Sequence, residues 1–226
     1  MTWDWDIAGD AFPVMLEAFL KVTLVVTAVG SLSAALLGLL WAVGQRELPG
    51  PASKLLSWVL GIIRMTPIPL QLLFVYAIFS DAGGFRSFES IDGQTKAMIL
   101  GIIVFGVHYS TYMAESYRAG IDSIAKGQWE AATALSLPMT RTWRAVIFPQ
   151  AVRATLPSLG NWAIAMFKDT PFLLAISVTE MVTEAKAIGG AQFSYIEAFT
   201  IAGLIFLAAS YPTAILMRTL EKKLAY

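Results

Sequence analysis

The stretch GQWEAATALSLPMTRTWRAVIFPQA, residues 127–151, differs from the long apolar runs on either side of it. It contains consecutive strong helix formers, and Glu130 lies in the first turn of the helix they predict. We expect a short helix over 128–137, with Gly127 as its N-cap and Pro138 ending it. A helix of about ten residues is only marginally stable alone, so another surface must hold it.

The composition around this stretch is that of a membrane protein. Of 226 residues, 57% are hydrophobic and 14% are charged, whereas about 25% is the usual charged share in globular proteins. The chain has no cysteine and a formal net charge of zero. Disulfides and thiolate sites are therefore excluded, and nothing in the charge favours a nucleic-acid partner.

Long apolar segments predict an all-α membrane protein with five transmembrane helices in a single domain, residues 1–226. The predicted spans cover residues 14–43, 55–79, 97–117, 156–178 and 198–217. Proline interrupts the second span at Pro67 and Pro69, and charged residues lie inside the fourth. The longest connection is the loop 118–153, which contains the opening stretch.

The distribution of basic residues predicts the orientation in the membrane. The loops 44–54 and 118–153, with the C-terminal tail, hold ten lysines and arginines, and the alternate loops hold three. The N-terminus is therefore expected outside and the C-terminus in the cytoplasm. This arrangement requires an odd number of spans and places the loop 118–153 in the cytoplasm.

The short helix in that loop has two interpretations. Ala131, Ala134 and Leu135 give it a face of apolar, mostly small side chains. That face could lie on lipid or pack on its own bundle, or it could dock on a soluble partner. The residues alone leave both possibilities open.

The stretch resembles the EAA loop of permease subunits in ATP-binding-cassette (ABC) importers. The pattern is EAA, three residues, Gly, nine residues, Ile, any residue, Leu-Pro. Here Glu130, Ala131 and Ala132 are followed at the right spacing by Ser136 and by IFP at 147–149. Ser136 stands in place of the glycine, and a phenylalanine replaces the leucine. The stretches 62–76, 106–121 and 156–170 also resemble the polar-amino-acid permease subfamily.

The resemblance implies a type I ABC importer transmembrane domain in the inner membrane, with the EAA helix as its coupling helix. It implies two ATP-binding cassette subunits, a second permease subunit and an extracytoplasmic solute-binding protein as partners. Glu130 would pair with the ATPase, and Ala131 and Ala132 would allow close approach. Arg141 and Arg144 would frame this dock, or anchor the loop at lipid headgroups.

Charged and polar residues at membrane depth are candidates for the solute path. Asp169 and Thr170 could accept the amine of a zwitterion, and Lys168 or Arg64 could bind its carboxylate. The alternatives are snorkelling of Arg64 and an ion pair between helices at Lys168 and Asp169. Three further polar candidates are Gln71, Glu115 and Asn161. Gln71 and Asn161 could instead hydrogen-bond between helices, and Glu115 could pair with Arg118, one turn away.

No ATP-binding motif of the form G-x-x-x-x-G-K-[ST] and no catalytic constellation occurs in the sequence, so we expect a non-catalytic subunit without a cofactor. His108 is the only histidine, so we expect no metal site. The stretches 106–121 and 161–181 look most like permeases for ectoine and hydroxyectoine, with polar amino acids as the near alternative. A different class, a secondary transporter or channel that needs no ATPase, would show inverted repeats, which we do not find.

Overall fold

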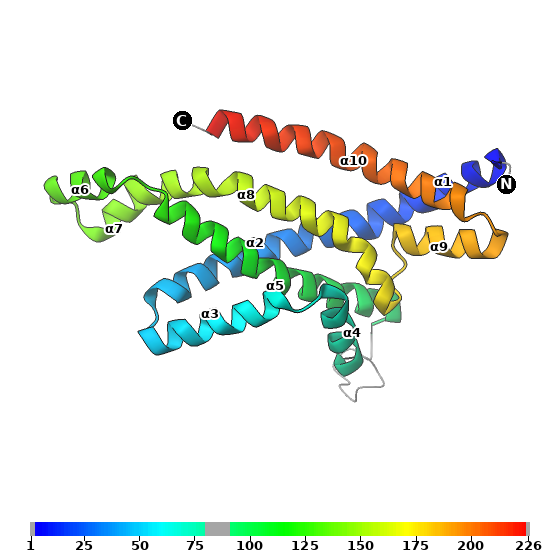
Figure 1. Cartoon of the computed structure of the whole chain (residues 1–226), viewed down its shortest axis with the longest axis horizontal. Helices are drawn as coiled ribbons and strands as arrows, with labels where there is room; N and C mark the ends of the chain where they lie inside the picture. Colours follow the sequence, from blue (N-terminus) through cyan, green and yellow to red (C-terminus); the bar gives the residue numbers. More distant parts are fainter. Residues whose placement is uncertain (1–2, 80–90, 225–226) are drawn as a thin grey trace.

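The computed structural model describes residues 3–79 and 91–224, which form helices joined by short turns (Figure 1). The elements in chain order are α1 (Trp5–Ala18), η1 (Phe19–Thr23), α2 (Leu24–Glu47), α3 (Gly50–Met65), α4 (Ile68–Phe79), α5 (Gly93–Asp122), α6 (Lys126–Ala134), α7 (Met139–Arg141), η3 (Thr142–Ile147), α8 (Phe148–Asp169), η4 (Thr170–Ile176), α9 (Met181–Gln192) and α10 (Tyr195–Leu224). Within the described ranges no strand occurs. The predicted all-α class is confirmed.

The first three elements form one continuous helix of 43 residues, Trp5–Glu47, which contains the predicted span 14–43. Asp4 caps it, because its Oδ1 accepts hydrogen bonds from the amides of Asp6 (2.9 Å) and Ile7 (3.2 Å). At about 1.5 Å per residue the helix is about 64 Å long, roughly twice the thickness of the hydrocarbon layer. It therefore extends well beyond one membrane thickness.

The predicted span 55–79, which Pro67 and Pro69 interrupt, consists of two helices, α3 and α4, that meet at an angle of 102°. Thr66 is extended (φ −89°, ψ 131°), as expected for a residue that precedes proline. The Pro67 carbonyl then accepts hydrogen bonds from the amides of Leu70 and Gln71, both at 3.1 Å, and so begins α4. The sequence located the break but could not predict its angle.

The fourth predicted span, 156–178, is α-helical only as far as Asp169, where α8 ends. The chain continues as the 3₁₀ segment η4, since Pro171 lacks an amide donor for an α-helical bond. Ser177, in the left-handed region at φ 58°, ends η4.

In the described part of the chain, three helices are long and apolar enough to cross a membrane: the 43-residue helix, α5 and α10. The bent pair α3–α4 is a fourth candidate if it counts as one span. The more polar α8 is not among them, although α2, α5 and α10 all pack against it. The count of five spans stays a prediction.

Two apolar clusters hold the bundle together. One joins α2, α4, α5, α8 and η4, and the other joins α1, α9 and α10 to the end of α8. The contact between α2 and α5 is especially close at Gly38. A Cβ on that glycine would lie 2.9 Å from the Met113 Cβ and 3.0 Å from the Ser110 carbonyl oxygen.

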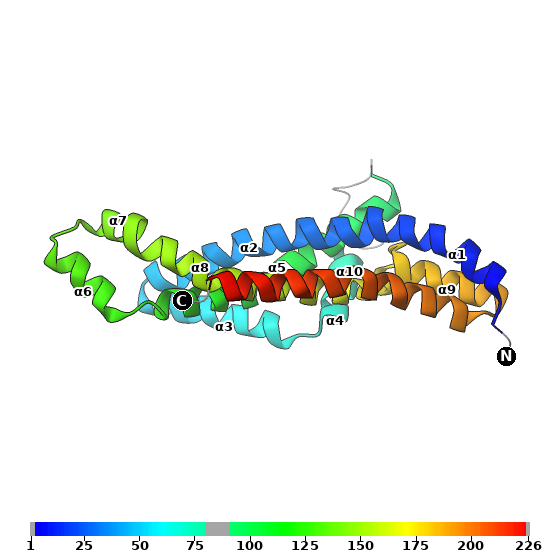
Figure 2. The same cartoon turned by 90° about the horizontal axis from the view of Figure 1, so that it is seen from above.

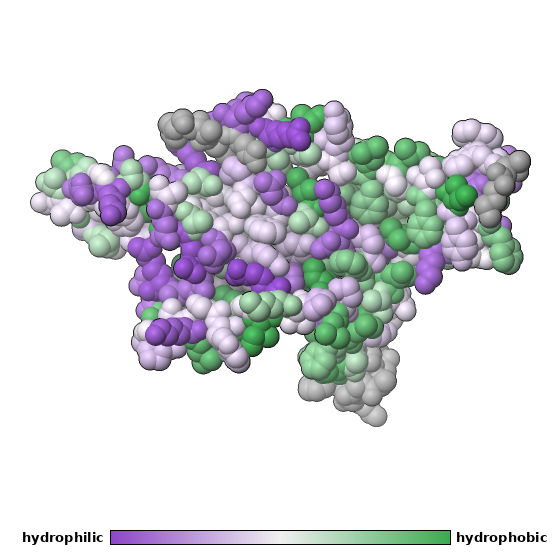
Figure 3. All heavy atoms as spheres, in the orientation of Figure 1, coloured by the Kyte–Doolittle hydropathy of each residue, from purple (hydrophilic) through white to green (hydrophobic). Residues whose placement is uncertain are grey.

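The two ends of the elongated molecule differ (Figures 1 and 2). The α6–α7 loop forms one end, which we call the α6 end, and the C-terminus lies toward it. The N-terminus and α9 lie at the opposite end, which we call the α9 end. On the face in Figure 3, hydrophilic residues gather toward the α6 end, and hydrophobic residues lie over α4 and the first half of α10.

Candidate functional site

The α6 helix is held by its own loop. Ile124, Ile147 and Ala151 form a small buried cluster beneath it, and the Trp129 and Trp143 rings meet edge to face with centroids 5.4 Å apart. These contacts supply the supporting surface that so short a helix requires.

The exposed side of α6 faces away from this support. Glu130 and Ala131 are exposed, and Leu135, just after the helix, is 73% exposed. Ala132 is only 3% exposed. Ala132 thus packs inside the loop in this structure, and only Ala131 of the two alanines is open to a partner.

The ends of α6 differ from the sequence prediction. The helix begins at Lys126 with Ala125 as N-cap, so Gly127 is an interior residue rather than the cap. It ends at Ala134, before Pro138, because Ser136 takes the left-handed conformation at φ 52°. The Ser136 amide donates to Thr133 O (2.9 Å) and the Leu137 amide to Ala132 O (3.0 Å), which is a Schellman motif. A serine thus makes the turn for which the EAA pattern has glycine.

The two predicted docking arginines lie in the elements that follow α6 in the chain. Arg141 and Arg144 are both exposed, the first in α7 and the second in η3. A third arginine, Arg46 at the end of α2, places its guanidinium carbon 5.1 Å from the centroid of the Trp143 ring. Arg46 was not predicted to take part, because α2 lies far from the loop in sequence.

A second site is an open cavity where α3, α5 and α8 come together beside the α3–α4 bend. We name it the Asp169 cavity; its volume is about 430 Å³. Asp169 and Arg64 line it together with the aromatic rings of His108, Tyr109, Tyr112 and Trp162. A carboxylate and a guanidinium thus share one aromatic-walled cavity.

Hydrogen bonds fix the polar groups of this cavity. The Tyr109 hydroxyl donates to Asp169 Oδ2 at 2.6 Å and so joins α5 to α8. Arg64 donates from Nη2 to the Thr111 carbonyl (3.0 Å), and its guanidinium carbon lies 5.3 Å from the centroid of the Tyr112 ring. The inter-helix partner of Asp169 is therefore a phenol rather than a lysine.

Gln71 stabilises the bend beside the cavity. Its side-chain amide donates to the carbonyls of Ile63 (2.7 Å) and Thr66 (3.1 Å) at the end of α3. Its Oε1 lies 3.2 Å from Nδ1 of His108. Gln71 thus ties α3, α4 and α5 together, as the packing alternative for this residue predicted.

The remaining predicted path residues do not all reach the Asp169 cavity. Lys168 and Asn161 lie exposed on α8, and neither lines it. Thr170 is fully buried, its hydroxyl donates to the Phe167 carbonyl at 2.8 Å, and it does not line the cavity. Glu115 lies 3.4 Å from Arg118, which confirms that these two residues can pair.

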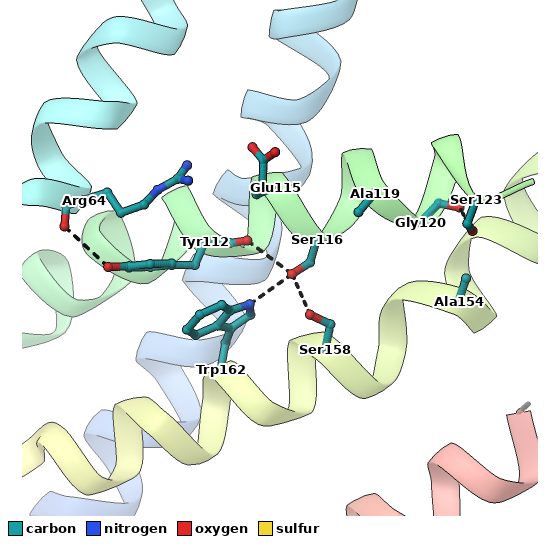
Figure 4. Close-up of a pocket in the computed structure, with 10 residues that line it drawn as sticks. All are labelled: Arg64, Tyr112, Glu115, Ser116, Ala119, Gly120, Ser123, Ala154, Ser158 and Trp162. Atoms are coloured by element: carbon teal, nitrogen blue, oxygen red, sulfur yellow. Dashed lines mark hydrogen bonds between the residues drawn. The ribbon is translucent and has the colours of Figure 1, made fainter.

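A further cavity of about 420 Å³ adjoins the first (Figure 4). Ser116 on α5 and Ser158 on α8 meet across it with their hydroxyls 2.7 Å apart, and the indole of Trp162 donates to Ser116 Oγ at 3.0 Å. We name it the Ser116 cavity. Glu115 belongs to its lining but points away from Trp162 and Ser158 (Figure 4).

Sequence reasoning missed Tyr109, Ser116 and Ser158. Their partners are 60 and 42 residues away along the chain, and single hydroxyls in apolar helices carry no local signal. It also missed Glu180, which is fully buried and caps α9 by accepting a hydrogen bond from the Thr183 amide at 2.7 Å. Burial raises the pKa of this carboxyl.

Comparison with known proteins identifies the family of the chain. The family model described as binding-protein-dependent transport system inner membrane component matches residues 34–226. The probable amino-acid ABC transporter permease protein y4tG of Sinorhizobium fredii is 32% identical over 99% of this chain and 94% of its own length. The glutamine transport system permease protein GlnP of Escherichia coli is 31% identical over 99% of both chains.

A solved structure agrees in fold over nearly the whole chain. A chain of "an amino acid ABC transporter with histidines" superposes with a TM-score of 0.87 at 28% identity, covering 99% of this chain and 100% of that one. The chain therefore belongs to the inner membrane components of binding-protein-dependent transport systems, the non-catalytic permease subunits of ABC importers, and has their type I fold.

Proposed function

We propose that this permease subunit imports polar amino acids, or amino-acid-like compatible solutes such as ectoine and hydroxyectoine, by alternating access. The observation that carries the proposal is the Asp169 cavity, in which Asp169 and Arg64 lie among aromatic rings. A zwitterion needs an acceptor for its cationic group and a donor for its carboxylate, and aromatic rings favour a cationic group. The names of the relatives y4tG and GlnP support the amino-acid class.

The exposed face of α6 is the proposed dock for an ATP-binding cassette subunit. Glu130, Ala131 and Leu135 are exposed on or just after a helix that is firmly supported from behind. Family membership implies ATPase and solute-binding partners. We propose two ATPases, a second permease subunit and one extracytoplasmic solute-binding protein.

The proposed orientation places the N-terminus outside and the C-terminus in the cytoplasm. It is supported by the ten basic residues in the α6-side loops and tail, and by the two termini lying toward opposite ends of the molecule. The alternative of an ATP-independent secondary transporter or channel is not compatible with membership of the family.

The narrower solute proposal is ectoine or hydroxyectoine. Its support is the resemblance of 106–121 and 161–181 to permeases for these solutes, whereas GlnP favours glutamine. Uptake by proteoliposomes that contain the assembled transporter, its own binding protein and ATP will decide. Saturable ectoine uptake that excess glutamine does not inhibit supports the proposal, and glutamine uptake without ectoine uptake refutes it.

The docking role of α6 is tested by reversing one charge. Glu130→Arg is expected to abolish ATP-dependent uptake while the subunit still reaches the membrane, because a positive charge would face the ATPase. Glu47→Arg is the matched control, since Glu47 is also exposed, at the end of α2 nearest α6. Uptake that is unchanged in Glu130→Arg contradicts the docking role.

The solute role of Asp169 is tested against its partner Tyr109. If Asp169 binds the cationic group, Asp169→Asn raises the KM about tenfold or more, as expected for the loss of a charged hydrogen bond. Tyr109→Phe leaves the carboxylate in place and is expected to change KM much less. Equal loss of assembly in both variants would show that the pair only holds α5 against α8.

A further inference from the structure

The Asp169 cavity and the Ser116 cavity, both open, have a wall in common. Arg64, Tyr112 and Trp162 are the residues of the described chain that line both the Asp169 cavity and the Ser116 cavity. Along α5, the Asp169 cavity touches His108 and Tyr109, whereas the Ser116 cavity continues toward the α6 end as far as Ser123. The cavities therefore follow one another along the length of the bundle. We name the three shared residues the partition.

Contacts between side chains of three different helices close the partition (Figure 4). The rings of Tyr112 and Trp162 lie with centroids 4.5 Å apart, which joins α5 to α8. Arg64 extends from α3 and lies over the other side of the contact, with its guanidinium carbon 5.3 Å from the Tyr112 ring centroid. The Trp162 indole on α8 donates a hydrogen bond to Ser116 Oγ on α5, and the Ser116 hydroxyl is in turn hydrogen-bonded to Ser158 on α8.

These contacts are suited to open and close. Each is non-covalent, and each joins two helices, so a small movement of α8 relative to α5 would break the ring contact and the serine contact together. Arg64 Nε is buried and has no hydrogen-bond partner in the described part of the chain. A buried donor without an acceptor is unfavourable, so the closed arrangement does not satisfy Arg64 fully. An opened partition would let that donor reach water or a solute carboxylate.

We propose that Arg64, Tyr112 and Trp162 form a gate within the subunit, which separates an Asp169 chamber from a Ser116 chamber on the solute path. This inference rests on the proposed function, because a path is required for a gate. It gives Arg64 a second role, as a member of the gate that a solute carboxylate can draw away from the Tyr112 ring.

The absence of cysteine from this chain makes the gate directly testable, since a single introduced thiol is the only one that can be labelled in this subunit when its band is separated from the other subunits. Ala165 lines only the Asp169 cavity and Ala154 only the Ser116 cavity. The two are about 16 Å apart along α8. Ala165→Cys and Ala154→Cys are made separately in the assembled transporter in sealed vesicles, and a membrane-impermeant maleimide is added on the side of the membrane that holds α6.

The gate predicts fast labelling of Ala154→Cys and slow labelling of Ala165→Cys. Adding Trp162→Ala is expected to speed labelling of Ala165→Cys at least tenfold and to leave Ala154→Cys unchanged. Trp162→Phe keeps a ring and is expected to stay near the parent. If Trp162→Ala fails to assemble, Tyr112→Leu tests the same ring contact. Equal Ala165→Cys labelling with and without the gate variant overturns the gate.

The labelling requires neither solute nor ATP. A gate that responds as expected in a transporter that takes up no amino acid or ectoine would therefore disprove the proposed function while leaving the gate standing. Normal uptake with no change in labelling would disprove the gate while leaving the proposed function standing.

Discussion

Replacing Ser136 by glycine should stabilise the end of α6. Ser136 sits at φ 52° in the Schellman turn, where a residue with a Cβ loses about 1–2 kcal/mol relative to the right-handed region. Glycine avoids this cost but loses about 0.5–1 kcal/mol through its greater freedom in the unfolded chain. The net gain is about 1 kcal/mol, which corresponds to an opening equilibrium about fivefold less favourable.

Hydrogen exchange measures this opening directly. The reporters are the amides of Ser136 and Leu137, which donate the two hydrogen bonds of the turn, and they are followed in the assembled transporter. In Ser136→Gly the peptides that carry these amides should exchange about fivefold more slowly than in the parent. Ser136→Ala keeps the Cβ and should exchange like the parent. The reasoning is refuted if Ser136→Gly exchanges as fast as Ser136→Ala.

Three further perturbations follow from the packing and are read from thermal unfolding of the purified transporter. Burial raises the pKa of the Glu180 carboxyl, so its ionisation destabilises the native state as pH rises from about 4 towards neutral. Over that range the stability advantage of Glu180→Gln over the parent should grow. A stability difference that does not depend on pH would contradict this. Gly38→Ala places a Cβ against the α5 backbone and should lower the free energy of unfolding by about 1–3 kcal/mol. In Gly203→Ala the new Cβ meets nothing within 4 Å, and the free energy of unfolding should rise by about 0.5–1 kcal/mol. Equal shifts of the unfolding temperature in the two variants would show that the α2–α5 contact is loose. Gln71→Met removes two hydrogen bonds at the α3–α4 bend and should cost about 1–3 kcal/mol, and an unchanged midpoint would show that the prolines alone hold the bend.

Turn chemistry explains the main differences between sequence prediction and structure at α6. Proline signals are strong in sequence, so Pro138 was expected to end the helix. The chain instead turns two residues earlier at Ser136, because two backbone hydrogen bonds and the buried cluster beneath the helix offset the cost of a left-handed serine. Local propensity cannot report that compensation. The burial of Ala132 is likewise a property of the folded loop, which local propensity does not report.

The sequence by itself determined that the chain is an all-helical membrane protein with a short polar helix between apolar segments. These properties depend on local composition and residue spacing, which can be read directly from the sequence. Its EAA pattern also led to the family, which the comparisons then established. It placed the break at Pro67 for the same local reason.

Only the tertiary structure decided how distant segments meet. It set the 102° angle between α3 and α4 and joined Tyr109 to Asp169 across 60 residues. It also brought Arg64, Tyr112 and Trp162 from three helices into one wall between two cavities. Such contacts depend on which helix faces pack together, and that choice is made by the volumes and hydrogen bonds of the whole bundle rather than by any one stretch.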